Sequence, residues 1–244
     1  MDLLQIEKIS KRFSGLQVLK DIAFRIRQGQ IIGLIGPNGA GKTTLFNLIT
    51  GYIRPDEGAI RFKERDITGL KPYEICKMGI SRTFQIVRPF SNLTVLENVK
   101  LGAYNQSKGR MEATEKAFAI CDFIGLGQKV NRLCKFLTLQ DQKKLELARA
   151  LATAPELILL DEVMSGLNPT EIEEISQLIY KIRESNITVL VIEHIMKAIM
   201  NFSDYIVVIS FGELIAQGEP EAVVRDQKVI EAYLGEDFAA TRRR

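Results

Sequence analysis

The sequence contains no tryptophan, a single histidine and three cysteines, and it has no apolar run long enough to cross a lipid bilayer. Because His194 is the only histidine, nothing in the chain resembles a histidine-based metal site or a Ser-His-Asp triad. Cys76, Cys121 and Cys134 lack the spacing of metal ligands, and an odd number of cysteines suits a reducing compartment. No signal-peptide pattern follows Met1. We therefore expect a cytoplasmic chain that reaches a membrane only through a partner.

A strong excess of one charge is also lacking. The chain has 33 Lys and Arg residues against 30 Asp and Glu residues, and the net charge of +3 is too weak to indicate nucleic-acid binding. Apolar residues make up 46% and charged residues 26% of 244 positions, as is usual for a globular protein of one to two domains. Residues 242–244 are all Arg and are expected to form a solvated tail, with contact to anionic lipid as the alternative.

A glycine-rich stretch lies between an apolar run and a helical pattern. Residues 31–35 predict a buried strand, and residues 45–49 predict a helix. A strand, a glycine-rich loop and a helix, with Lys42 and Thr43 at the junction, form the phosphate-binding P-loop pattern. The loop N–H groups can surround an anion, Lys42 adds charge for the outer phosphates, and the Thr43 hydroxyl can bind Mg²⁺. The residues predicted to bind nucleotide here are Gly36, Pro37, Asn38, Gly39, Ala40, Gly41, Lys42, Thr43 and Thr44.

Strand patterns lie on both sides of this loop. Residues 3–9, 18–27 and 58–62 predict an antiparallel sheet at the edge of the P-loop core. Phe13 is expected in a loop between the first two strands, where its ring could stack on an adenine base. The alternative is a ring that fills the edge of the sheet.

The middle of the chain has helical patterns. A strand is expected to begin near Gly79 and to end at Gln85. Residues 88–153 carry no strand signal and predict a helical insertion. Its helices are expected to begin at a capping box formed by Thr94 and Glu97 and to cover residues 112–124 and 138–153.

Two wholly apolar runs later in the chain end in polar residues. Residues 157–160 precede Asp161 and Glu162, and residues 188–192 precede His194 by two positions. Ligands of parallel sheets bind at the carboxyl ends of the strands, so Asp161 is placed to hold Mg²⁺ and Glu162 to activate water as a general base. His194 could contact the γ-phosphate, and Gln85 could reach the metal or the water. Each residue alone has an ordinary structural explanation, but their order behind a complete P-loop favours a catalytic site.

The rest of the second half predicts a turn, a helix and a hairpin. The turn is expected at residues 165–169, and Thr170 and Glu173 are expected to cap the next helix. A strand at residues 205–209 should lead into a hairpin around Phe211 and Gly212. The buried stripe of the helix is expected to contain Ile172, Ile175, Ile179 and Ile182.

This order of motifs resembles the ATP-binding subunits of ABC transporters over nearly the whole chain. In that family Phe13 matches the adenine-stacking aromatic residue, residues 36–43 match the Walker A motif, and Gln85 matches the Q-loop that couples the nucleotide site to the membrane subunit. Asp161 ends the Walker B motif and Glu162 matches the catalytic carboxylate. The remaining matches are the D-loop at residues 165–168 and the switch histidine at His194.

Three segments are most similar to the branched-chain amino-acid uptake subfamily. These are residues 81–85, 166–169 and 232–235. Urea importers and the lipopolysaccharide-export ATPase are similar near the C-terminus, so this match is the less specific one.

The resemblance implies an α/β fold with a RecA-like P-loop core, an antiparallel β edge subdomain and an inserted α-helical subdomain. We expect one ATP-binding domain over residues 1–244, with its core in 1–87 and 154–215, the helical subdomain in 88–153 and a C-terminal extension in 216–244. ATP and Mg²⁺ are the implied cofactors, with Thr43, Gln85 and Asp161 as metal ligands. The implied partners are a second ATP-binding subunit, integral membrane permeases that residues 85–105 contact and, indirectly, a solute-binding protein. No nucleic acid is expected, and the chain should lie peripherally on the cytoplasmic face of the cell membrane.

One motif departs from the family pattern. The family signature Leu-Ser-Gly-Gly-Gln corresponds to residues 137–141, where both glycines are missing and Thr138 keeps the hydroxyl. Leu139 and Gln140 replace the glycines. Gln140 adds a side chain where the family backbone approaches a γ-phosphate, and Asp141 is expected to repel that anion. In this family the signature acts on the nucleotide of the partner subunit. The resemblance therefore implies pairing with a different subunit whose signature is intact, in preference to a homodimer.

Two other functions remain open. A regulatory subunit that binds ATP with little hydrolysis is favoured by the altered signature and opposed by Glu162 and His194. A soluble ABC-type ATPase of translation or DNA repair would usually carry two cassettes or a long insert, and this chain has neither. A P-loop kinase is disfavoured because no acceptor-site or lid pattern is present.

Overall fold

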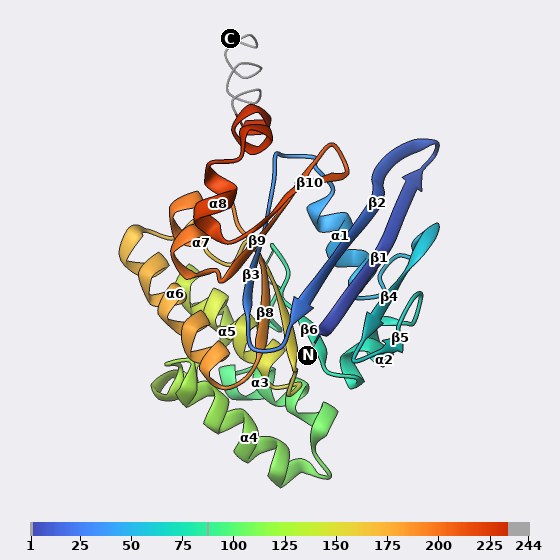
Figure 1. The fold of residues 1–244 in the computed structure, drawn as a ribbon. Helices are drawn as coiled ribbons and strands as arrows, with labels where there is room; N and C mark the ends of the chain where they lie inside the picture. Colours follow the sequence, from blue (N-terminus) through green and yellow to red (C-terminus); the bar gives the residue numbers. More distant parts are fainter. Residues whose placement is uncertain (1, 87, 234–244) are drawn as a thin grey trace. The chain divides into compact units, whose positions relative to one another are not determined.

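The structure is a computed structural model that describes residues 2–86 and 88–233 (Figure 1). The chain forms two compact units. The first unit contains Met1–Pro72 and Leu190–Arg244, and the second contains Tyr73–Val189. The chain passes from one unit to the other within α2 (Pro72–Lys77) and again within β8 (Thr188–Ile192). The 242–244 tail and part of the 232–235 segment lie outside the described residues.

An antiparallel sheet forms the N-terminal part of the first unit (Figure 1). β1 (Asp2–Phe13) pairs with β2 (Leu16–Arg27) and with β4 (Glu57–Phe62), and β5 (Arg65–Asp66) pairs with β4. The predicted edge sheet is therefore confirmed, but the expected loop at Phe13 is wrong. Ser14 and Gly15 have φ values of 47° and 88°, which suit a two-residue hairpin turn, so the strand continues through Phe13 up to the turn.

The P-loop strand of the first unit is completely buried. All five residues of β3 (Ile31–Ile35) are buried, and β3 runs parallel to β9 (Tyr205–Ser210). A Cβ at Gly33 would lie 2.7 Å from Ile206 and 2.9 Å from Ile199, so this glycine lets β9 and α7 (Met196–Phe202) approach β3 closely. The predicted hairpin follows, since β10 (Glu213–Gly218) pairs antiparallel with β9. The helices α1 (Lys42–Ile49) and α8 (Pro220–Val224) also belong to this unit.

The second unit contains the predicted helices. α3 (Val95–Ala103) begins at Thr94 and Glu97, which form the predicted reciprocal capping box. α3 packs against α4 (Arg110–Phe123) and α5 (Leu139–Leu151), which confirms the two further helices. Three short 3-10 turns lie at Tyr104–Gln106, Gly127–Lys129 and Cys134–Phe136. The domain limits at residues 88 and 153 stay a prediction, because the compact units divide the chain elsewhere.

Two parallel strands of the second unit support the acidic residues. β6 (Ile80–Arg82) pairs with β7 (Leu157–Asp161), whose five residues are all buried. β6 ends at Arg82, so the expected strand end at Gln85 is wrong by three residues. The Thr83 N–H still donates to the Leu159 carbonyl of β7. The strand stops there because the next N–H, that of Phe84, donates to the Glu146 side chain and not to β7.

The helix after β7 begins earlier than expected. α6 (Pro169–Glu184) is capped by Asn168 and Glu171 in a reciprocal capping box, so the predicted cap at Thr170 and Glu173 is wrong. Pro169 decides between the two patterns, because its fixed φ suits the first helical position. The buried stripe is confirmed at three of its four residues, Ile175, Ile179 and Ile182, with Ile172 half-buried.

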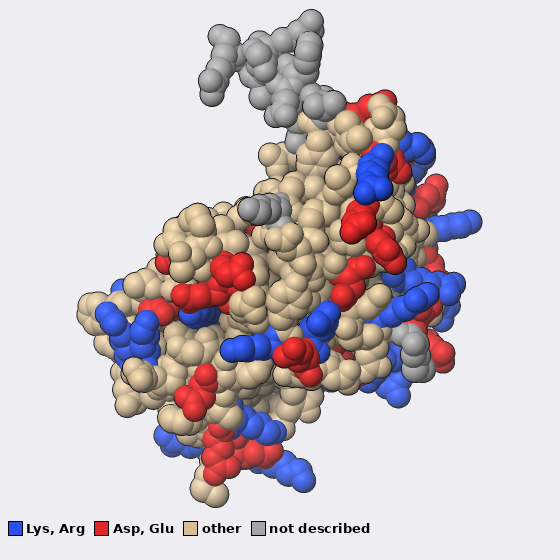
Figure 2. Space-filling model, turned by 60° about the vertical axis from the view of Figure 1, so that its left-hand side comes forward, with Lys and Arg blue, Asp and Glu red and all other residues tan. Residues whose placement is uncertain are grey.

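Among the residues that the structure describes, no helix has both the length and the hydropathy needed to span a membrane. Lys and Arg side chains are interspersed with Asp and Glu side chains over the face shown in Figure 2, in agreement with the small net charge.

Candidate nucleotide-binding site

The loop between β3 and α1 has a backbone that requires glycine. Gly36 and Gly41 have φ values of 150° and 101°, which side chains disfavour. A Cβ on Gly36 would also collide with the carbonyl oxygen of Ile209, and one on Gly41 would lie 2.5 Å from a Leu19 methyl group. The glycines are therefore needed both for the turn and for close packing on β2 and β9.

The Lys42 side chain bonds to the backbone of this loop. Its side chain is buried, and Nζ donates to the carbonyl oxygens of Gly36 at 2.6 Å and Pro37 at 2.8 Å. α1 has no acidic residue in its first turn, so no carboxylate there offsets the positive end of the helix dipole. This combination of a buried ammonium group, a glycine loop and a helix N-terminus suits a phosphate group.

The remaining predicted residues of the loop differ in solvent exposure. Asn38, Gly39 and Thr43 are exposed, Thr44 is half-buried, and Pro37 and Ala40 are buried. The exposed Thr43 hydroxyl at the start of α1 is able to contact a metal ion bound beside a phosphate.

Phe13 and His194, two further candidates of the first unit, are both exposed. Phe13 is 44% exposed, and Lys11 Nζ lies over its ring at 5.4 Å from the ring centre. His194 follows the end of β8, as predicted. Their nucleotide contacts stay predictions.

Asp161 in the second unit is held by a buried ion pair that we did not predict. Arg82 Nη2 lies 2.7 Å from Asp161 Oδ2, with the two side chains 5% and 3% exposed. The Thr83 hydroxyl accepts a hydrogen bond from the Asp161 backbone N–H at 3.0 Å. The end of β6 therefore fixes both the carboxylate and the backbone of Asp161.

We expect Arg82→Met to lower the free energy of unfolding by about 3–5 kcal/mol, because the buried Asp161 carboxylate would lose its cation. Urea unfolding of the purified chain measures this. The matched control is Arg25→Met, since Arg25 pairs with Asp2 while 70% exposed and should cost less than about 1 kcal/mol. Equal losses in the two variants would contradict a structural role for the Arg82–Asp161 pair.

Gln85 and Glu162 meet directly in the second unit. Gln85 Nε2 donates to Glu162 Oε2 at 2.6 Å. Two residues of α5 that the sequence analysis did not consider contact the same segments: Lys143 donates to the Glu162 carbonyl at 3.0 Å, and Glu146 accepts the Phe84 N–H at 2.7 Å. The only sequence signal for them is a pair of opposite charges three positions apart, in a helix that also contains Asp141, Lys144 and Arg149.

The signature segment begins α5. The Thr138 hydroxyl caps the helix by accepting the Asp141 N–H at 3.2 Å, and Leu139 is 45% exposed. Gln140 Nε2 donates to Glu174 Oε2 at 2.7 Å. The buried Asp141 carboxylate is paired with Lys129 Nζ at 2.7 Å, which offsets its charge, and the expected repulsion of a phosphate by Asp141 stays a prediction. The Gln140 side chain is the other change that was expected to weaken phosphate contact.

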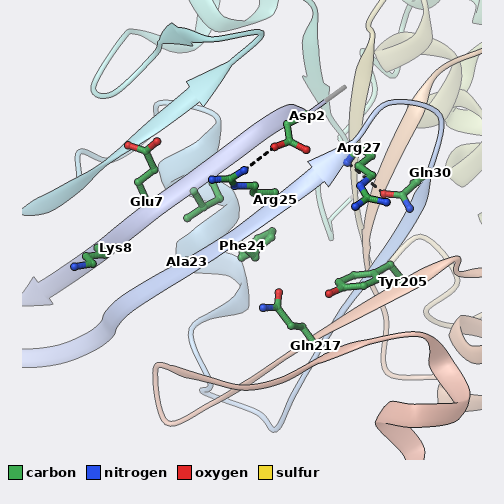
Figure 3. Close-up of a pocket in the computed structure, with 11 residues that line it drawn as sticks. Asp2, Glu7, Lys8, Ala23, Phe24, Arg25, Arg27, Gln30, Tyr205 and Gln217 are labelled. Atoms are coloured by element: carbon green, nitrogen blue, oxygen red, sulfur yellow. Dashed lines mark hydrogen bonds and ion pairs between the residues drawn. The ribbon is translucent and has the colours of Figure 1, made fainter.

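The structure also has a pocket of about 620 Å³ in the first unit that contains none of the predicted site residues (Figure 3). It lies along β2, and Tyr205 and Gln217 line its other side (Figure 3). Asp2 and Glu7 offset the charges of Lys8, Arg25 and Arg27, and Asp2 pairs with Arg25 at 3.1 Å. This mixed lining does not favour a phosphate, so the glycine loop remains the candidate site.

Two protein families match the chain. The family described as ABC transporter matches residues 19–165, and the family described as branched-chain amino acid ATP-binding cassette transporter matches residues 213–239. The first range contains the glycine loop, Gln85, Asp161 and Glu162.

Curated relatives match over nearly the full length. The high-affinity branched-chain amino acid transport ATP-binding protein LivG of Salmonella typhimurium is 40% identical over 96% of this chain and 98% of its own length. The corresponding BraF protein of Pseudomonas aeruginosa is 38% identical, with the same coverage.

Solved structures agree with these relatives. A nucleotide-free ATP-binding cassette from an ABC transporter superposes with a TM-score of 0.88 at 34% identity, over 96% of this chain and 99% of that one. A dimeric post-hydrolysis cassette bound to ADP and Pi superposes with a TM-score of 0.80 at 26% identity, over 89% of this chain and 99% of that one.

Proposed function

The chain belongs to the ABC transporter family as one of its ATP-binding cassette ATPases, and we propose that it hydrolyses Mg·ATP to power the import of branched-chain amino acids or a similar small polar solute. The observation that carries the choice of substrate is the full-length similarity to proteins named for high-affinity branched-chain amino acid transport. The match of residues 213–239 to the branched-chain cassette family supports the same choice.

The roles of the site residues follow from their chemistry. Lys42 and the loop N–H groups bind the phosphates, Phe13 stacks on the adenine, and His194 contacts the γ-phosphate. Mg²⁺ prefers oxygen ligands, so the Thr43 hydroxyl and the Asp161 carboxylate fit it, with the Gln85 amide oxygen as a further ligand. When bound, the ion neutralises charge on the phosphates. Glu162 accepts a proton from the attacking water, and the Gln85 amide orients its carboxylate.

We further propose that residues 85–105 bind an integral membrane permease at the cytoplasmic face of the membrane, with a solute-binding protein acting on the other side. Exposed apolar side chains along this segment support the contact: Ile86 is 66%, Phe90 52%, Leu101 45% and Tyr104 44% exposed. Apolar surface of this kind favours a protein partner.

The experiment that tests this function is transport by reconstituted vesicles. The chain is combined with a branched-chain amino-acid permease and its solute-binding protein, and uptake of labelled leucine is measured with and without internal ATP. ATP-dependent uptake supports the proposal. ATP hydrolysis and permease binding without uptake of any branched-chain amino acid would overturn the substrate while leaving the ATPase assignment in place.

The altered signature favours an unlike partner subunit. Gln140 occupies a position where the family has glycine, and its side chain is tied to Glu174, which also pairs with Lys144 at 2.9 Å. We therefore propose a heterodimer in which the partner supplies an intact signature to this chain's ATP, whereas the partner's own ATP is hydrolysed slowly. A regulatory subunit that binds ATP with little hydrolysis is the second candidate, on the same observation.

Restoring glycine tests the asymmetry. Gln140→Gly should raise hydrolysis at the partner's site by about tenfold or more, since added donors at a transition-state phosphate have effects of that size. Turnover is measured in heterodimers whose other site is inactivated by Glu162→Gln in this chain. Equal hydrolysis at the two sites of the unmodified heterodimer would rule the asymmetry out, and tight ATP binding without turnover would favour the regulatory subunit.

A further inference from the structure

α5 contains three charged side chains that are almost completely buried: Asp141, which is paired with Lys129, and Lys143 and Glu146. Lys143 is 3% and Glu146 is 7% exposed, and they lie three positions apart on the same face of the helix. Burying a charge is costly unless it makes specific polar contacts. The polar contacts of Lys143 and Glu146 offset this cost.

Lys143 closes a ring of three residues. Its ammonium group donates to the backbone carbonyl of Glu162 at 3.0 Å and to that of Gln85 at 3.5 Å. Gln85 in turn donates its side-chain amide to the Glu162 carboxylate at 2.6 Å. Glu162 is thus held at both ends, its backbone by Lys143 and its carboxylate by Gln85.

The backbone of Glu162 needs such support. Its φ is 51°, in the left-handed region that is unfavourable for a residue with a long side chain. A hydrogen bond from an ammonium group to its carbonyl is stronger than one from a neutral donor and opposes relaxation of this turn. The bond from Lys143 therefore helps to keep the backbone of Glu162 in this left-handed conformation directly after β7.

Glu146 fixes the other segment. It accepts the N–H of Phe84, the residue directly before Gln85, at 2.7 Å. Burial raises the pKa of the Glu146 carboxyl, and the Phe84 N–H and the charge of Lys143 oppose this shift. One turn of α5 therefore holds both segments that carry Gln85 and Glu162.

We propose that Lys143 is a positioning residue for ATP hydrolysis, which fixes the backbones of Glu162 and Gln85 so that the carboxylate faces the attacking water. Glu146 assists by holding Phe84. The inference rests on the proposed role of Glu162 as general base. Lys143 itself touches neither ATP nor water in this scheme.

The test compares Lys143→Met, which keeps the apolar stem, with Lys143→Arg, which keeps a charged donor. Loss of one charged hydrogen bond corresponds to about 10–100-fold, so kcat of Lys143→Met should fall by that factor while KM for ATP stays within about threefold. Lys143→Arg should recover most of kcat. The charge-matched control is Lys116→Met on α4, whose ion pair with Glu112 is exposed and whose kcat should be that of the unaltered chain.

A double-mutant cycle separates positioning from general stability. If Lys143 acts through Gln85 and Glu162, the combined loss in Lys143→Met with Gln85→Ala should be smaller than the product of the two single losses. Thermal unfolding of each variant is recorded alongside. If Met prevents folding, Lys143→Gln keeps a neutral N–H donor and should lose about tenfold in kcat.

Two results would overturn the proposal: an unchanged kcat in Lys143→Met, whether or not KM rises, or losses that multiply fully with Gln85→Ala. Failure of the general-base assignment looks different, because Glu162→Gln would then keep the turnover of the unaltered chain. An inactive Glu162→Gln together with a fully active Lys143→Met would refute only the positioning role.

Discussion

Glu162→Gln should abolish steady-state ATP hydrolysis while leaving ATP binding intact. A positioned general base contributes about 10²–10⁴-fold, so kcat should fall by at least about 100-fold. Glutamine has nearly the same shape and can still accept the hydrogen bond that Gln85 donates to Glu162 Oε2 at 2.6 Å. The variant therefore removes the base with little change in packing.

The measurement pairs steady-state phosphate release with equilibrium binding of a fluorescent ATP analogue. The matched control is Glu173→Gln on α6, where Glu173 is exposed and accepts a hydrogen bond from Gln177 at 2.9 Å. The control should keep both turnover and binding. Turnover within about tenfold of the unaltered chain in Glu162→Gln would show that another group accepts the proton.

Short sequence patterns predicted most of the fold. The buried runs that became β3, β7 and β8 are uninterrupted and apolar, and such strands are recognisable without knowledge of their neighbours. The P-loop was equally recognisable from its glycines. Gly36 and Gly41 take backbone angles that other residues avoid, so the loop requires glycine at these positions. Here the local residue types alone determine the local structure.

Errors at element ends arose where two local patterns overlapped. Asn168 with Glu171 and Thr170 with Glu173 both have capping-box spacing, and Pro169 favours the first. Phe13 was assigned to a loop because Ser14 and Gly15 indicate a turn, whereas a two-residue turn needs no further loop residues.

The partners of buried charges could not be predicted from the sequence. Arg82 and Asp161 lie 79 positions apart, and Lys129 and Asp141 lie 12 apart. Nothing in the local sequence says that Asp141 is neutralised, so its charge was expected to act on a phosphate. Lys143 was missed for the same reason, because its contact with Glu162 depends on the packing of α5 against β6 and not on any motif.

Lys42→Ala should abolish nucleotide binding rather than only slow hydrolysis. The Lys42 ammonium group is buried and bridges the carbonyls of Gly36 and Pro37, so its loss removes a positive charge at the phosphates and leaves two buried acceptors without that donor. Charged hydrogen bonds contribute about 1.5–3 kcal/mol each, and we expect the Kd for ATP to rise by at least about 100-fold.

The thermal shift caused by ATP measures this loss without reference to turnover. At an ATP concentration of about 100 times Kd, binding stabilises the unaltered chain by about 2.7 kcal/mol, and Lys42→Ala should lose nearly all of that increment. Lys20→Ala on β2 is the control, because Lys20 is 59% exposed, pairs with Glu213 at 2.7 Å and should keep the full shift. A full ATP shift in Lys42→Ala would mean that the glycine loop binds phosphate through its backbone alone. Loss of the shift in both variants would point to a general effect of removing a positive charge.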